Sequence, residues 1–336
     1  MTTPVIETRD LRVSLPAGFR WPFRGATPLV DILPGVSLTI GPGEIVCMVG
    51  ESGSGKTTFG KALLGLARPS SGSILFEGAP LADFRPRSFR PIRRKAALLF
   101  QDPVSSFDPR QRIGSIIAEP RRIAGLGGTG MEPVRELAAR AGLPVHFLSR
   151  FPHALSGGQA RRAAVARALS ADPALIVADE PTAGLDVSVQ GGVLNLFRDI
   201  RASRNTAFLI ITHNLAVARL IADRIVILYL GRVVEEGTPE DIFSHPRHPY
   251  TRALIMSEPI PDPLRRRKAP PVMGEVPGIA RRPAGCEFHT RCPQARELCR
   301  VAAPAPTAFS DTQSAACHFP LAPAAAQPID VKAKTA

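Results

Sequence analysis

A glycine-rich loop is the most informative segment of the sequence. Residues Gly50 to Thr57 read Gly-Glu-Ser-Gly-Ser-Gly-Lys-Thr, the spacing of a phosphate-binding loop. Glycine lets successive backbone N–H groups turn inward around phosphate oxygens, where a side chain would block the anion. Lys56 can then reach the terminal phosphates of a nucleotide, and the Thr57 hydroxyl can bind Mg²⁺. The loop predicts a nucleotide-phosphate site.

Polar side chains that could act on a bound nucleotide follow three apolar runs. Asp179 and Glu180 follow Leu-Ile-Val-Ala, Gln101 follows Ala-Leu-Leu-Phe, and His213 follows Leu-Ile-Ile-Thr. Ligands of open α/β sheets bind at the carboxyl ends of the strands, so these residues are expected near the loop. Asp179 would lie near Mg²⁺, and Glu180 would face an attacking water. The pattern indicates nucleotide hydrolysis.

The elements around the motifs must place them at one end of a sheet. An apolar run over 44–49 predicts a buried parallel strand before the loop, and helix formers over 56–67 predict a helix after it. Further strands are expected over 5–15, 36–40, 73–77, 97–100, 174–178 and 208–211. Helices are expected over 113–124, 132–141, 159–170 and 187–201. This alternation predicts an α/β fold with a parallel sheet and a helical insertion.

Length and composition set the broad class. A chain of 336 residues with 44% hydrophobic residues can bury a substantial core. No run of eighteen apolar residues occurs, and the N-terminus lacks the basic and apolar regions of a secretion signal, so we expect a cytoplasmic protein. The net charge of +13 could suit nucleic acid, anionic lipid headgroups or nucleotides. Because the arginines are scattered, solvated surface is the simplest interpretation.

In this order the motifs resemble those of the ATPase subunits of ABC transporters, from about Val5 to Gly237. The resemblance assigns the ATP-binding Walker A loop to Gly50, Glu51, Ser52, Gly53, Ser54, Gly55, Lys56, Thr57 and Thr58. It assigns catalysis to Glu180, His213 and Gln101, and Mg²⁺ binding to Thr57, Gln101 and Asp179. It assigns the signature to Ser156, Gly157, Gly158 and Gln159, and the D-loop to Asp186. Two such ATPase domains would sandwich two ATP molecules, so each signature would serve the partner's nucleotide.

The implied fold is a P-loop ATPase core with a RecA-like parallel sheet, an antiparallel β subdomain and an inserted helical subdomain at about 101–166. Composition changes near residue 250, and we expect an ATPase domain over 1–250, a Cys-rich extension over 251–320 and a disordered tail over 321–336. Ala160 and the pair Ala183-Gly184 depart from the usual family residues, and neither position contacts phosphate.

The C-terminal segments resemble those of dipeptide/oligopeptide importer ATPases, nearer to the F-type subunit. The segments are His245 to Leu254, Gly274 to Pro277 and Gly285 to Pro293, together with Gln101-Asp-Pro and Ile117-Ala-Glu-Pro. Four cysteines, Cys286, Cys292, Cys299 and Cys317, fall in the extension, where four thiolates suit an iron–sulfur cluster or zinc. The resemblance implies a 4Fe-4S cluster; zinc and unliganded thiols are the alternatives. Cys47 lies in the strand before the loop and is expected in the core.

We therefore expect an ATP-hydrolysing subunit of a peptide importer, peripheral on the cytoplasmic face of the inner membrane. The resemblance implies four partners: a second ATPase subunit, two membrane permeases and an extracytoplasmic solute-binding protein. The second ATPase subunit could be identical, but the family pattern implies a paralogue. No nucleic acid partner is expected. The alternatives are a soluble ABC-type ATPase acting on nucleic acid or ribosomes, and a non-hydrolysing module, which would be expected to lack Glu180 or His213. The cargo stays open among dipeptides, oligopeptides, glutathione, nickel chelates and opine-like compounds.

Overall fold

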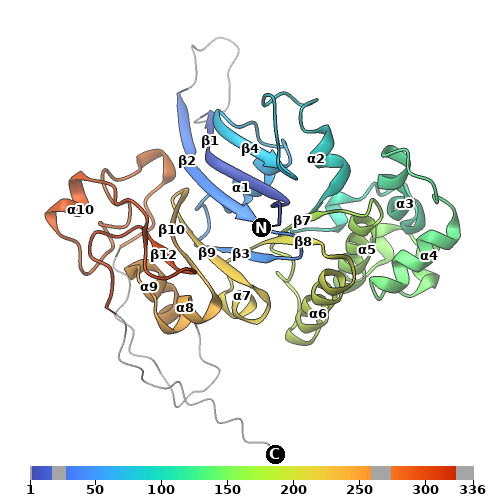
Figure 1. Cartoon of the computed structure of the whole chain (residues 1–336). Coiled ribbons are helices and arrows are strands. Elements are labelled where there is room, and N and C mark those ends of the chain that lie inside the picture. The colour runs from blue at the N-terminus through green and yellow to red at the C-terminus, as the bar shows by residue number, and fades with distance from the viewer. Residues whose placement is uncertain (1, 17–27, 259–273, 323–336) are drawn as a thin grey trace, which may run out of the picture.

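Two sheets organise the fold. The computed structural model describes residues 2–16, 28–258 and 274–322. Within these residues an eight-stranded sheet has the order β11-β12-β10-β9-β3-β8-β7-β6, and a four-stranded antiparallel sheet has the order β2-β1-β4-β5 (Figure 1). The strands are β1 (Ile6–Pro16), β2 (Leu29–Ile40), β3 (Ile45–Val49), β4 (Ser71–Phe76), β5 (Ala79–Pro80), β6 (Ala96–Leu99), β7 (Leu175–Asp179), β8 (Ala207–Thr212), β9 (Arg224–Tyr229), β10 (Arg232–Gly237), β11 (Thr307–Ala308) and β12 (Ser314–Ala315).

The helices cover both sides of the larger sheet. They are α1 (Lys56–Leu63), α2 (Arg90–Lys95), α3 (Ile113–Ile123), α4 (Met131–Arg140), α5 (Gly157–Leu169), α6 (Val187–Arg204), α7 (Leu215–Ile221), α8 (Pro239–Ser244), α9 (Pro249–Ser257) and α10 (Glu297–Val301). Short 3₁₀ helices span Val104–Ser106, Val145–Ser149, Pro152–Ala154 and Ile279–Arg281. Among the described residues, no helix is long and apolar enough to cross a membrane.

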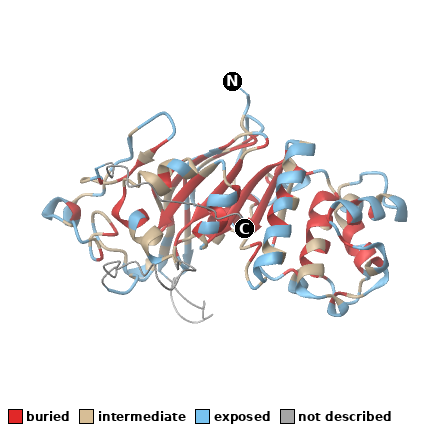
Figure 2. Cartoon of the chain, turned by 90° about the horizontal axis from the view of Figure 1, so that it is seen from below, coloured by how far each residue is buried: buried red, intermediate tan, exposed pale blue. Residues whose placement is uncertain are grey.

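The predicted parallel strands form the centre of the larger sheet. β3 pairs in parallel with β8 and β9, β8 pairs with β7, and β7 pairs with β6. Alternate residues of β3 enter different cores: Cys47 packs with the helices on one face, and Met48 packs with α1 and the antiparallel sheet on the other. Figure 2 shows the buried residues gathered on these central strands. The prediction that Cys47 lies in the core is confirmed, and burial raises the pKa of its thiol.

The helical insertion lies at one end of the sheet (Figure 1). α3 packs against α5 and α4, and α4 also packs against α5. Residues at helical spacing on α3, including Ile113, Ile116 and Ile117, are fully buried there. The insertion was expected from the loss of strand signals after residue 101, and its helices match the predicted ones within a few residues.

The predicted elements differ from the structure mainly at their ends, whereas β5, β9 to β12, α2 and α7 to α10 have no predicted counterpart. The helix expected over 56–67 ends at Leu63, because Gly65 takes φ 65° and the Gly65 and Leu66 N–H groups donate to the Ala62 and Lys61 carbonyls. These two bonds are the Schellman arrangement that stops a helix. β2 begins at Leu29, well before the expected strand 36–40. Residues 323–336 of the expected tail lie outside the described residues.

The C-terminal region packs against the larger sheet. β12 pairs with β10 through Glu235 and Glu236, and β11 pairs with β12, so the segment after residue 300 continues the larger sheet. The predicted boundary near residue 250 falls inside α9, whose residues Pro249, Tyr250 and Thr251 are buried. That boundary stays a prediction.

Candidate active site

The phosphate-binding loop connects β3 to α1 as the motif requires. Lys56 is buried, and its Nζ donates to the carbonyls of Gly50 (2.7 Å) and Glu51 (2.8 Å) and to Ser54 Oγ (3.3 Å). Burial lowers the pKa of this ammonium group, and nearby carboxylates partly oppose the shift. A Cβ on Gly50 would lie 2.2 Å from the Leu228 carbonyl oxygen, so glycine is required there. The loop thus curls around its own lysine at the N-terminus of α1, where phosphates are stabilised.

Two of the three predicted Mg²⁺ ligands meet beside the loop. Thr57 Oγ1 donates to Asp179 Oδ1 at 3.0 Å, across a separation of 122 residues. Burial raises the pKa of Asp179, and the Thr57 hydrogen bond opposes that shift. Gln101 follows β6 with an exposed side chain, and within the described chain no hydrogen bond joins it to Thr57 or Asp179. Hydroxyl and carboxylate oxygens are the ligands Mg²⁺ prefers.

Glu180 and His213 also meet. His213 Nδ1 lies 2.9 Å from Glu180 Oε1, and the imidazole is largely exposed. The Glu180 N–H donates to the Ile211 carbonyl, which ties the end of β7 to β8. Glu180 has φ 46°, a left-handed conformation that is uncommon for residues other than glycine. The pair can position a water and accept its proton next to the Asp179 site.

The signature residues begin α5. Ser156 caps the helix: its Oγ accepts from Gln159 N (3.4 Å), and its N–H donates to Gln159 Oε1 (2.9 Å). Ser156 and Gly157 are exposed, and a Cβ on Gly157 would meet nothing within 4 Å. Asp186 caps α6 through Val189 N (2.9 Å), and this bond lowers the pKa of its carboxyl. The open N-terminus of α5 suits an anion.

Arg161 is a site residue that sequence reasoning missed. Its side chain is buried and donates to the carbonyls of Gln101 (3.0 Å), Phe100 (3.3 Å) and Ala183 (3.2 Å). It therefore connects the signature helix to the segments that carry Gln101 and Asp186. The signal available in the sequence was an arginine two residues after the signature.

The four cysteines of the extension line one small cavity, together with His248, His289 and Phe288. All four are free thiols. Burial raises the pKa of Cys286 to about 12 and of Cys317 to about 11, and it also raises the pKa of Cys292. Among the described residues, no group of three or more His, Cys, Asp or Glu is arranged to hold a metal ion. The donor set suits a soft metal in its chemistry, and the 4Fe-4S or zinc site stays a prediction.

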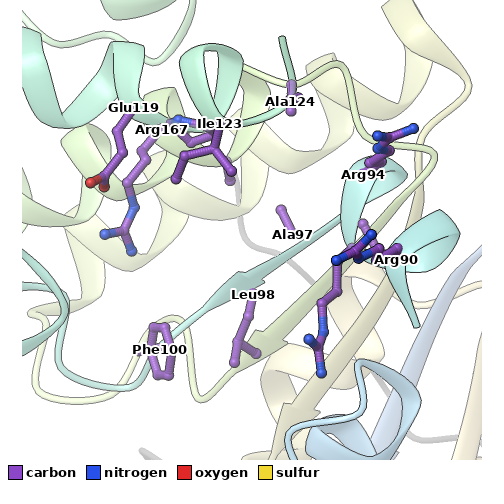
Figure 3. A pocket seen from close by; sticks show the side chains of 14 residues that line it. Arg90, Arg94, Ala97, Leu98, Phe100, Glu119, Ile123, Ala124 and Arg167 are labelled. Carbon is purple, nitrogen blue, oxygen red and sulfur yellow. The ribbon is translucent and has the colours of Figure 1, made fainter. Parts of the chain in front are cut away.

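A pocket of about 640 Å³ lies between the sheet and the helical insertion (Figure 3). Phe100, which is 40% exposed, and Ile123, which is 80% exposed, contribute apolar surface. The charged side chains around the pocket are Arg90, Arg93, Arg94, Glu119 and Arg167. The pocket is therefore apolar at its centre and mainly basic at its rim.

Comparisons with known proteins define the family. Residues 33–183 match the ABC transporter family, and residues 234–299 match the oligopeptide/dipeptide transporter C-terminal region. The oligopeptide transport ATP-binding protein of Escherichia coli is 39% identical over 307 residues, which cover 89% of this chain and 92% of that protein. The di/tripeptide transport ATP-binding protein of Pseudomonas aeruginosa is 41% identical over 293 residues, covering 86% and 90% respectively.

The fold has close structural counterparts. A dimeric ATP-binding cassette in a post-hydrolysis state, bound to ADP and Pi, superimposes with a TM-score of 0.62 at 26% identity, covering 70% of this chain and 98% of that chain. The chain belongs to the ATP-binding subunits of ABC transporters, in the oligopeptide/dipeptide group, which are ATPases. The predicted fold class is confirmed.

Proposed function

We propose that this chain hydrolyses ATP to power the import of peptides or peptide-like solutes through a membrane permease. The observation that carries the proposal is the meeting of Lys56, Thr57 and Asp179 at one loop, with Glu180 and His213 alongside. The relatives named for peptide transport, matched over nearly their full length, support the cargo class. They favour the importer over the ATPase acting on nucleic acid or ribosomes.

The residues divide the chemistry between them. The loop amides of Gly50 to Thr58 and the Lys56 ammonium would hold the phosphates, and Thr57 and Asp179 would hold Mg²⁺ with Gln101 as the proposed third ligand. Mg²⁺ held there would supply positive charge that neutralises the phosphates. Glu180 orients the attacking water and accepts its proton, and His213 holds the Glu180 carboxylate in position.

We further propose that the nucleotide site is completed by a second ATPase subunit. The exposed residues Ser156 and Gly157 at the N-terminus of α5 would bind the γ-phosphate held by the partner's Walker A loop. The dimeric counterpart bound to ADP and Pi supports this arrangement. The partner is proposed to be a paralogue.

The pocket in Figure 3 is the proposed permease contact. Exposed Phe100 lies next to Gln101, so a helix that moves in this pocket would move the proposed Mg²⁺ ligand. The assembly would contain two permeases and an extracytoplasmic solute-binding protein. The chain would lie peripherally on the cytoplasmic face of the inner membrane.

For the extension we propose that Cys286, Cys292, Cys299 and Cys317 bind a 4Fe-4S cluster, with zinc as the alternative. Support comes from their shared cavity, in which Cys299 is buried and the other three cysteines are partly buried. Protein purified without oxygen should contain about four iron and four sulfide per chain. One zinc without visible absorbance would select the alternative, and absence of both metals would remove the site.

The uptake experiment tests the function as a whole. A strain lacking this chain is complemented with the wild type or with Glu180→Gln, and uptake of labelled dipeptides and oligopeptides is measured. Nickel, glutathione and opine uptake serve as controls for the other cargo classes. We expect peptide uptake only with the wild type. Unchanged uptake of every solute in the deletion strain would contradict the cargo class, whereas uptake restored equally by Glu180→Gln would contradict its dependence on ATP hydrolysis.

A further inference from the structure

The C-terminal region contacts the phosphate-binding loop directly at Glu51. Arg291 Nη1 donates to Glu51 Oε2 at 2.6 Å, and Arg291 Nη2 donates to Glu51 Oε1 at 2.9 Å. The two residues are 240 positions apart in the sequence. Two parallel N–H···O bonds fix both the distance and the orientation of the carboxylate. Arg291 of the C-terminal region therefore holds Glu51, the second residue of the loop, in place.

The main chain of Glu51 is also held on both sides. Its N–H donates to the Tyr250 hydroxyl at 2.9 Å, and its carbonyl accepts from Lys56 Nζ at 2.8 Å. Tyr250 lies on α9, in the region of the oligopeptide/dipeptide match. Each polar group of Glu51 thus has a partner, and one of them is the lysine that reaches the phosphates.

Arg291 and Tyr250 are both buried against aromatic rings. Arg291 is 8% exposed, and its guanidinium lies over the rings of Phe288 (5.9 Å) and Tyr229 (6.0 Å). Tyr250 is 1% exposed and packs against the same two rings, with centroid distances of 5.3 and 4.6 Å. A guanidinium on aromatic faces and a close ring cluster lose little further freedom when they bind Glu51.

The charges of Arg291 and Glu51 link their contact to the phosphate site. The Glu51 carboxylate belongs to a loop that must bind the negative phosphates, and an unpaired carboxylate there would repel them. Arg291 neutralises this charge, and Tyr250 fixes the adjacent backbone. We propose that Arg291 and Tyr250 are positioning residues of the nucleotide site, so that the C-terminal extension tunes the affinity of the loop. This inference rests on the proposed function.

A double-mutant cycle of Arg291 and Glu51 tests the inference. Full-length protein is titrated with MgADP, which is not hydrolysed, and the Kd is measured by calorimetry. Arg291→Gln should weaken binding by about tenfold or more, because the partly buried Glu51 loses its partner. Glu51→Gln alone should tighten MgADP binding about threefold or more, because it removes the negative charge of the loop and leaves the Arg291 cation unpaired near the phosphates. The double variant should return to within about threefold of the wild type.

The rescue separates positioning from a structural role. If Arg291 only held the extension together, the double variant would bind as poorly as Arg291→Gln, and the inference would be overturned. Arg300→Gln, at an exposed arginine of α10, is the matched control and should leave the Kd unchanged. Tyr250→Phe, which keeps the ring, should weaken binding by about fivefold through the lost hydrogen bond.

The proposed function and the inference fail differently. Wild-type protein that does not bind MgADP would overturn the proposed function and the inference with it. Wild-type binding with the same Kd in Arg291→Gln and Tyr250→Phe would overturn the inference alone. Hydrogen exchange of the extension amides in each variant shows whether the extension stays folded. A raised Kd that occurs only together with lost protection of these amides would also overturn the inference.

Discussion

The buried carboxylate of Glu235 should be a principal determinant of how firmly the extension is attached. Glu235 has no exposed surface, and burial raises the pKa of its carboxyl. Its Oε1 accepts from Arg247 N (2.7 Å) and Gln313 Nε2 (3.0 Å), and its Oε2 accepts from His248 N (2.8 Å). One side chain on β10 thus joins the turn before α9 to the segment before β12.

The hydrogen bonds of Glu235 allow the loss of stability caused by Glu235→Ala to be worked out. The substitution leaves three donors without an acceptor, and each buried unpaired donor costs about 1–3 kcal/mol. The substitution also removes the free-energy cost of burying the carboxylate itself. We therefore take the lower end of the range for three donors, about 3 kcal/mol, as the loss of stability. A change of this size raises the equilibrium constant for local opening by about 10²-fold. Slowly exchanging amides of α9 and β12 should lose protection by that factor in hydrogen exchange followed by mass spectrometry.

Glu236→Ala is the matched control on the next residue of the strand. Glu236 is partly exposed and contacts Arg224 (3.2 Å) and Ser314 (3.3 Å), so its loss should cost at most about 1 kcal/mol. Equal loss of protection in the two variants would refute the argument that the buried network of Glu235 holds the extension.

Three further outcomes are expected. Glu180→Gln should keep MgATP affinity but lower phosphate release by the assembled complex about 10²-fold or more; near-normal turnover would sink the assignment. Ser156→Arg should abolish turnover in the complex while leaving MgADP binding by the isolated chain unchanged, and normal turnover would contradict the shared site. Burial lowers the pKa of His248 to about 3, so its contribution to stability is complete above the ordinary pKa of 6.5 and falls as the pH drops toward 3. The region around α9 should therefore lose on the order of 1 kcal/mol of stability at pH 5.5, measured by hydrogen exchange, and His248→Phe should reduce this pH dependence.

The parts of the structure that were predictable from the sequence depend on local patterns. The apolar run of β3 and the glycines of the loop specify a strand, a turn and a helix through neighbouring residues alone. Asp179 and Thr57 could be placed together because the carboxyl ends of parallel strands share one side of a sheet. The end of α1 was missed, because the Schellman arrangement at Gly65 depends on a glycine that a helical pattern tolerates.

What could not be predicted depends on contacts between distant residues. Arg291 reaches Glu51 across 240 positions, and no spacing rule connects them. β11 and β12 are two residues each, too short for any alternation to be visible. Arg161 lies next to a recognised motif, but its role appears only when the carbonyls of Gln101 and Ala183 are seen around it.

The pairing of β12 with β10 has a consequence for any shortened form of this protein. β10 contacts β9 on one side, and its other side is covered by β12 at Glu235 and Glu236. A chain cut after α9 would present that side as a row of unpaired N–H and C=O groups, the template on which strands of other molecules add. A minimal cassette made in this way is expected to self-associate edge to edge. We therefore expect the C-terminal region to protect the rest of the chain from edge-to-edge association.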